Sequence, residues 1–271
     1  MSIISISRGS LAAGQTVAEI LAERLGYRCV GSEALVEAAT QHGVSDSEVT
    51  KLLETRPGFW ERLSASKEWY VTVLSAAMCD IARDGKLVYH GLAGQELLRG
   101  VDHILKVRVV APMPQRVQYV MDAQKLSADG AKKWIENVDE DRFQRMRYLF
   151  GIDWRDPLLY DAILNLGNMS NETAAGVLAE LASQPAYQPT PQSVKQMNDL
   201  AISSRVKATV LEQFPGAAVE VKADDGVVWL TGNVQALGDE REPLVRAVKA
   251  LPGVRAVHAE LGFQAMPYVH P

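Results

Sequence analysis

Short apolar runs alternate with helical patterns through residues 1–183. The apolar runs lie at residues 2–7, 27–30, 86–90, 103–110 and 161–166. Each has the length and boundaries of a buried strand. Between the first two runs, Val17, Ile20, Leu21 and Leu25 recur at the spacing of a helix packed on one side. Strands that alternate with helices predict an α/β fold, in which a parallel sheet is wrapped by helices.

The remaining helices of this part are predicted from their caps and breaks. One runs over residues 66–83, one begins near residue 115 after two prolines, and one covers residues 137–150. Ser170 is the expected N-cap of the last helix, which ends near residue 183. Ser32 and Ser45 are also expected to be N-caps, the second within a capping-box spacing that ends at Glu48.

Composition changes at residues 183–193, which carry three prolines and no charged residue. Such a stretch is typical of an extended linker between domains. After it, the pattern predicts a helix at 194–214, strands at 217–222 and 227–234 joined by a turn at Asp225-Gly226, a helix at 240–251 and a strand at 254–263. We therefore predict a domain at residues 1–183, a linker at 184–192, a small αββαβ domain at 193–264 and a tail at 265–271.

The bulk composition narrows the function classes. The 271 residues are 47% hydrophobic and 23% charged, with a net charge of −5, which disfavours non-specific nucleic-acid binding. No apolar stretch approaches the length of a membrane span, and the first residues lack the basic start of a signal peptide. We expect a cytoplasmic protein with no integral membrane segment, in which Cys29 and Cys79 are reduced thiols.

The first candidate functional residues lie in the loop after the first strand. Gly9 and Gly14 are separated by four residues and followed by Gln15-Thr16, where a phosphate-binding P-loop has Lys-Ser/Thr. Backbone N–H groups at the start of a helix attract phosphate, and the Thr16 hydroxyl stands where a P-loop hydroxyl binds Mg²⁺. The amide of Gln15 can donate a hydrogen bond but carries no charge. The alternative is a tight turn with no ligand. The candidate phosphate-binding residues are Arg8, Gly9, Ser10, Gly14, Gln15 and Thr16.

A second group of candidates lies in the helix at 137–150. Arg142 and Arg145, three residues apart, point the same way and suit a transferring phosphoryl group. Arg147 lies about 200° round the helix from Arg145, so the three converge only if the segment bends. The alternative is a solvated helix in which nearby carboxylates pair with these arginines. Asp153, just after the helix, could orient them.

Together these segments resemble the cytidylate-kinase-like branch of the nucleoside monophosphate kinases. The resemblance rests on residues 7–16, 138–147, 151–157 and 160–165, which recur in the order typical of that family, and it covers about residues 1–183. It implies a P-loop NTPase-type three-layer fold with a five-stranded parallel sheet, ATP and Mg²⁺ as the donor, and a nucleoside monophosphate as the acceptor. By position, Gly14, Gln15 and Thr16 would hold the donor phosphates. Arg142, Arg145 and Arg147 would belong to a lid, with Asp153 in the turn after it.

The sequence departs from that family at two cations. Gln15 replaces the basic P-loop residue, and His90-Gly-Leu-Ala stands where relatives tend to have Gly-Arg-Gly-Ala. Fewer cations around a highly charged reaction centre predict weaker transition-state stabilisation. The sequence therefore leaves three hypotheses open: a nucleoside monophosphate kinase of reduced activity, a nucleotide-binding sensor that signals through its second domain, and a kinase that acts on a different small acceptor.

The second domain resembles a BON domain. The matching segments are residues 199–207, 225–234 and 253–257. The resemblance implies a non-catalytic module that binds a ligand or a protein partner, which the sequence does not identify.

Overall fold

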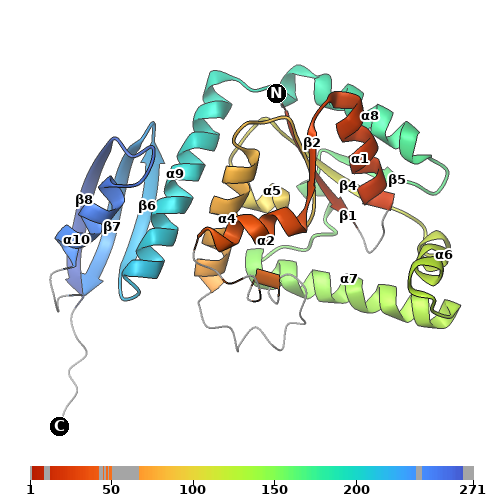
Figure 1. Ribbon diagram of the computed structural model, residues 1–271, viewed down its shortest axis with the longest axis horizontal. Helices are drawn as coiled ribbons and strands as arrows, with labels where there is room; N and C mark the ends of the chain where they lie inside the picture. The colour runs from red at the N-terminus through yellow and green to blue at the C-terminus, as the bar shows by residue number, and fades with distance from the viewer. Residues whose placement is uncertain are drawn as a thin grey trace, which may run out of the picture.

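Five parallel strands form the central sheet, in the order β2-β3-β1-β4-β5 (Figure 1). The computed structural model describes residues 2–8, 13–42, 45, 47, 49, 50, 67–235 and 240–264. All five apolar runs form strands, so the predicted α/β fold with a five-stranded parallel sheet is confirmed. The strands are β1 (Ile3–Arg8), β2 (Arg28–Gly31), β3 (Leu87–His90), β4 (Ile104–Val110) and β5 (Ala162–Asn165).

Helices cover both faces of this sheet, which makes the three layers of a P-loop kinase-like fold. Helices α1 (Ala13–Leu25) and α8 (Asn171–Ser183) lie side by side on one face, where Ile4 and Ile6 of β1 are fully buried (Figure 1). On the other face, Ile3 and Tyr89 pack against the remaining helices. These are α2 (Ser32–Thr40), α4 (Lys67–Ala82), α5 (Gly94–Leu97) and the last turns of α7 (Ala128–Phe150).

Local capping explains where several helices begin. The Ser170 hydroxyl accepts a hydrogen bond from the Thr173 N–H, so its predicted role as an N-cap is confirmed. Ser127 caps α7 in the same way, which starts that helix nine residues before the expected residue 137. The prediction for Ser32 is wrong: β2 runs directly into α2, Gly31 is the N-cap, and the Ser32 hydroxyl accepts from the Leu92 N–H instead. The expected cap at Ser45 falls partly outside the described residues, because Asp46 and Glu48 are not among them.

Helix α7 follows α6 (Met113–Gln124) after a short turn and packs against it beyond the carboxyl end of β4, and the pair is called the α6–α7 hairpin (Figure 1). The two helices hold each other through a small apolar cluster of Val120, Ala131 and Ile135. A 3₁₀ turn, η2 (Pro157–Leu159), then leads into β5. The hairpin therefore stands over the edge of the sheet at which a P-loop fold binds its ligands.

The second domain is a three-stranded sheet with two helices, one before its first strand and one between its second and third strands. Strands β6 (Ala218–Asp224), β7 (Val227–Gln235) and β8 (Ala256–Gln264) follow α9 (Pro191–Gln213), and α10 (Arg241–Lys249) precedes β8. The turn at Asp225-Gly226 joins antiparallel β6 and β7, with both residues at positive φ. Strand β8 pairs with β7 in parallel, so the predicted αββαβ order is confirmed.

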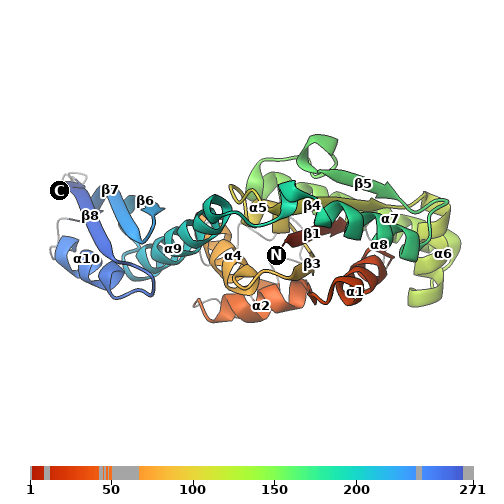
Figure 2. The same ribbon diagram turned by 90° about the horizontal axis from the view of Figure 1, so that it is seen from above.

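Helix α9 belongs to both domains. Its Met197 and Ala208 are buried in the core around α4, while Val206 and Val210 are fully buried against the small sheet. Figure 2 shows α9 between the two bodies, beside α4. The expected linker, residues 184–192, contains a 3₁₀ turn, η3 (Pro185–Tyr187), and then the capping box and first residues of α9.

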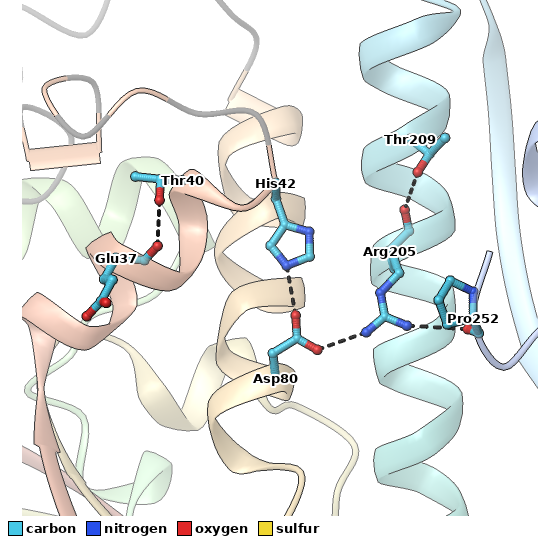
Figure 3. Close-up of polar contacts among 7 residues, drawn as sticks. All are labelled: Glu37, Thr40, His42, Asp80, Arg205, Thr209 and Pro252. Carbon is cyan, nitrogen blue, oxygen red and sulfur yellow. Dashed lines mark hydrogen bonds and ion pairs between the residues drawn. The ribbon is translucent and has the colours of Figure 1, made fainter.

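Polar contacts reinforce this junction. The Asp80 carboxylate of α4 accepts from Arg205 of α9 at 2.8 Å and bonds the His42 ring at 2.9 Å (Figure 3). Arg205 also donates to the Pro252 carbonyl, in the loop before β8. Asp80 and Arg205 thus connect the segment just after α2 with α4, α9 and the loop before β8. None of the helices in the described ranges combines the length and apolar character that crossing a bilayer requires.

Candidate active site

The candidate site lies at the carboxyl ends of β1 and β4. Gly14, Gln15 and Thr16 occupy the first turn of α1, where backbone N–H groups lack helical partners and the helix dipole is positive. Gly14 is buried, and Gln15 and Thr16 are half-buried. Of the other residues proposed for the loop, Gly9 and Ser10 fall outside the described residues. Arg8 ends β1, and its side chain also falls outside them.

Gln15 uses its amide within its own helix. The Nε2 atom donates to the Glu19 carboxylate, 2.9 Å away and one turn further along α1. The side chain at the lysine position is thus uncharged and points its donor at a carboxylate. The first turn of α1 therefore offers phosphate its backbone N–H groups without a side-chain cation at this position.

The structure brings together two of the three arginines predicted on α7. The Arg142 guanidinium lies over the Trp154 ring, 5.5 Å from its centroid, and Arg145 is buried with only 7% of its surface exposed. Arg147 is exposed, because it lies on the opposite side of the helix and α7 remains helical to Phe150. The bend that would bring all three arginines together is absent from this helix.

Asp153 orients a different arginine from those expected. Its carboxylate accepts two hydrogen bonds from the Arg155 side chain, both at 2.9 Å, and a third from the Arg155 backbone. These hydrogen bonds hold the pKa of Asp153 below its usual value. Arg155 in turn lies over the Phe143 ring at 4.2 Å. Asp153 therefore fixes the turn that follows α7 and, with it, Trp154.

Arg108 of β4 is a site residue that the sequence analysis did not single out. Its guanidinium lies 4.4 Å from the centroid of the Trp154 ring, on which Arg142 also stacks. It donates to the Arg155 carbonyl at 2.9 Å, and burial lowers its pKa from the usual value. The sequence does not distinguish it, because the apolar run of β4 carries two charged residues, Lys106 and Arg108.

Tyr160 connects this arginine group to β1. Its hydroxyl donates to the Trp154 carbonyl at 2.7 Å and can accept from the Ser7 hydroxyl, 3.3 Å away and one residue before the end of β1. Burial raises the pKa of Tyr160, so the phenol stays protonated and keeps this donor at neutral pH. A continuous set of contacts thus runs from β1 through Tyr160 and Trp154 to Arg142 of α7.

A cavity of about 300 Å³ opens between β4, α6 and α7. Arg116 of α6, a second cation that the sequence analysis missed, pairs with Asp139 of α7 across it at 2.7 Å. A neighbouring hollow of about 370 Å³ lies between α6 and the start of α8, and Ala111 lines both. The first cavity is lined by three arginines, three carboxylates and Trp154: Arg108, Arg116, Arg155, Glu136, Asp139 and Glu140.

Metal-ligating side chains are sparse in this region. Within the described ranges, no three His, Cys, Asp or Glu side chains come together as a metal site. Thr16 is the residue on which the Mg²⁺ prediction rests, and it lies half-buried in the first turn of α1. Since Mg²⁺ keeps several waters and takes phosphate oxygens as ligands, a single protein hydroxyl is compatible with its coordination.

Comparison with known proteins agrees with this architecture. A cytidylate kinase of Methanopyrus kandleri is 24% identical over 166 residues, which is 60% of this chain and 83% of that protein. A cytidylate kinase of Methanothermobacter thermautotrophicus is 24% identical over 160 residues, which is 59% of this chain and 91% of that protein.

A crystal structure of an uncharacterized protein from Eubacterium ventriosum superposes with a TM-score of 0.53 at 17% identity, over 67% of this chain and 97% of that one. Residues 198–265 match the BON domain, and residues 3–168 match the cytidylate kinase-like family. The chain is thus a member of the cytidylate kinase-like family that carries a BON domain at its carboxyl side.

Proposed function

We propose that this protein transfers the γ-phosphoryl group of ATP to a nucleoside monophosphate of the cytidylate type. The proposal rests on one arrangement: the N-terminus of α1 and two arginines stacked on Trp154, Arg108 and Arg142, lie at the carboxyl edge of one parallel sheet. Phosphoryl transfer needs little beyond positioning and stabilisation of negative charge, and this edge supplies both.

The donor would lie against the start of α1. Gly14 leaves room for a phosphate to approach the backbone N–H groups, and the Thr16 hydroxyl would be the protein ligand of Mg²⁺. When bound, Mg²⁺ would neutralise charge on the donor phosphates. The fit to an anion is supported by Arg108, a half-buried cation for which no ion pair forms among the described residues.

The chemical step is a direct displacement. An oxygen of the acceptor phosphate forms a bond to the γ-phosphorus while the bond from that phosphorus to the β-phosphate oxygen breaks, which yields ADP and a nucleoside diphosphate. Arg142 and Arg145 would stabilise the charge on the transferred group from the α7 side. Closure of the α6–α7 hairpin would exclude water from it.

The uncharged side chain of Gln15 predicts a low rate of phosphoryl transfer. A single group that stabilises transition-state charge is often worth roughly 10²–10³ in rate, so we expect slow turnover compared with a kinase that has the P-loop lysine. The same feature supports a second proposal, that the protein is a nucleotide sensor. Its specific support is α9, which is shared by both domains and so could carry a change in the first to the second.

One assay separates the two proposals. Purified protein is mixed with ATP, Mg²⁺ and each of CMP, dCMP, UMP and AMP in turn, and nucleoside diphosphate is followed by chromatography. We expect slow formation of CDP, and Arg142→Met should lower the rate at least tenfold, whereas Arg147→Met, on the exposed side of the same helix, should not. Nucleotide binding without diphosphate formation would favour the sensor. Absence of both would reject nucleotide handling altogether.

A further inference from the structure

Arg108 is a half-buried guanidinium for which the described residues supply no counter-ion. Its Nε atom is fully buried and has no hydrogen-bond partner in the described part of the chain, and its one hydrogen bond goes to a neutral carbonyl. Five other arginines of the described residues each pair with a carboxylate: Arg99 with Glu96, Arg116 with Asp139, Arg155 with Asp153, Arg205 with Asp80 and Arg255 with Asp225. A partly desolvated cation that lacks such a pair is unfavourable unless an anion joins it.

The position of Arg108 places this cation beside the strand that leads into the P-loop. In the parallel pairing of β1 with β4, Arg108 is opposite Ser7, next to the last residue of β1. Tyr160 stands between them, with its hydroxyl on Ser7 and its ring 6.0 Å from the guanidinium. Arg108 also lines the cavity below the α6–α7 hairpin, so an anion in that cavity can reach it.

The guanidinium is held in place before any ligand arrives. The Trp154 ring lies against one face at 4.4 Å, and the Arg155 carbonyl accepts from one of its terminal nitrogens. Trp154 is itself 4% exposed, and Asp153 and Tyr160 fix the turn that carries it. An arginine restrained in this way loses little side-chain freedom when it binds an anion.

We propose that Arg108 is the phosphate-binding cation of this site and supplies from β4 the charge that Gln15 does not supply from α1. The inference rests on the proposed function, since it takes the ligand to be a nucleoside triphosphate. Arg108, a strand residue, would neutralise the phosphate charge that a lysine in the first turn of α1 would otherwise neutralise. A positive charge at position 15 should therefore be able to replace the positive charge of Arg108.

That exchange is the test. Arg108→Gln removes the charge but keeps a side-chain donor, and Gln15→Lys adds charge at the P-loop position. We expect Arg108→Gln to raise the Kd for Mg·ATP at least tenfold by isothermal titration calorimetry. Gln15→Lys in the Arg108→Gln background should recover most of that loss, and Arg108→Lys should retain much of the affinity.

Two controls separate charge from packing. Arg205→Met removes another half-buried arginine, one that is paired with Asp80 far from this edge, and should leave the Kd for Mg·ATP unchanged. If Arg108→Gln does not fold, the native protein gives the answer through phenylglyoxal labelling read by mass spectrometry. Saturating Mg·ATP should then protect Arg108 at least fivefold, and Arg205 should not be protected.

The results distinguish failure of the proposed function from failure of the Arg108 assignment. If the native protein binds no nucleotide, the proposed function fails first. If it binds Mg·ATP but Arg108→Gln binds equally well, or if Arg108 is labelled equally fast with and without the nucleotide, the assignment of Arg108 is overturned while the proposed function stands. Loss of affinity in Arg108→Gln that Gln15→Lys does not restore would show that Arg108 acts only through packing on Trp154, and would also overturn it.

Discussion

Trp154 organises the charge of the candidate site. Two guanidinium groups, those of Arg108 and Arg142, lie on its ring, one from β4 and one from α7. Cation–π contacts let like charges approach a common point without a carboxylate between them, because the ring face is negative. Of these two, Arg108 forms no ion pair among the described residues, in contrast to Arg116 and Arg155, which pair with Asp139 and Asp153.

The two cysteines allow a prediction about reactivity. The pKa of Cys29 is raised to about 11 and that of Cys79 to about 12, mainly by burial and to a smaller extent by the nearby carboxylates of Glu19 and Asp80 respectively. Both thiols therefore stay protonated at pH 8, where the thiolate fraction of Cys29 is on the order of 10⁻³. We expect native protein to react with iodoacetamide at pH 8 at least a hundredfold more slowly than urea-unfolded protein, as followed by mass spectrometry. Rapid labelling of Cys79 in the native state would contradict this placement.

At the level of elements, the sequence predicted what depends on local patterns and missed what depends on contacts between elements. The five strands and the Ser170 cap follow from hydrophobic runs and a capping residue, and the structure has both. Arg108 was missed because nothing local distinguishes it from a strand residue that reaches solvent. Its role comes from Trp154, which is distant in sequence. The role of residues 184–192 was hidden in the same way, since their prolines suit the start of a helix as well as a linker.

Gly232 gives the small sheet a prediction of its own. It lies inside β7 with φ of +137°, opposite Val219 of β6, and a Cβ there would overlap the Ala218 carbonyl oxygen. Since the obstructing atom belongs to a paired strand, relaxation would separate β6 from β7. We expect Gly232→Ala to lower the free energy of unfolding by about 3 kcal/mol, measured by urea denaturation.

Gly26→Ala is the matched control for that substitution. Gly26 also has a positive φ, +66°, but nothing lies within 4 Å of the position that its Cβ would take. This variant should show only the conformational cost of the left-handed region, about 1 kcal/mol. Equal losses in the two variants would mean that the close approach of β6 does not constrain Gly232.

At the scale of the whole molecule, α9 decides whether the two domains are independent. Domains joined by a flexible linker unfold separately, whereas here one helix contributes Met197 to the larger core and Val206 to the smaller one. Unfolding the small sheet would expose the second face of α9, and loss of α9 would expose α4. The stability of each domain is therefore expected to depend on the other.

Leu230→Ala tests that dependence. Leu230 is fully buried in β7, within the core of the small domain, and its truncation should remove about 3 kcal/mol of stability. If α9 couples the domains, the free energy of opening measured by native-state hydrogen exchange should fall by a similar amount for the amides of β1 and of β7. Leu178→Ala, in the core between α1 and α8, should produce the reciprocal effect on β7. A loss confined to β7 in the first variant and to the larger sheet in the second would show two independent folding units. In that case α9 could not carry a signal from the nucleotide site, and the sensor proposal would lose its structural support.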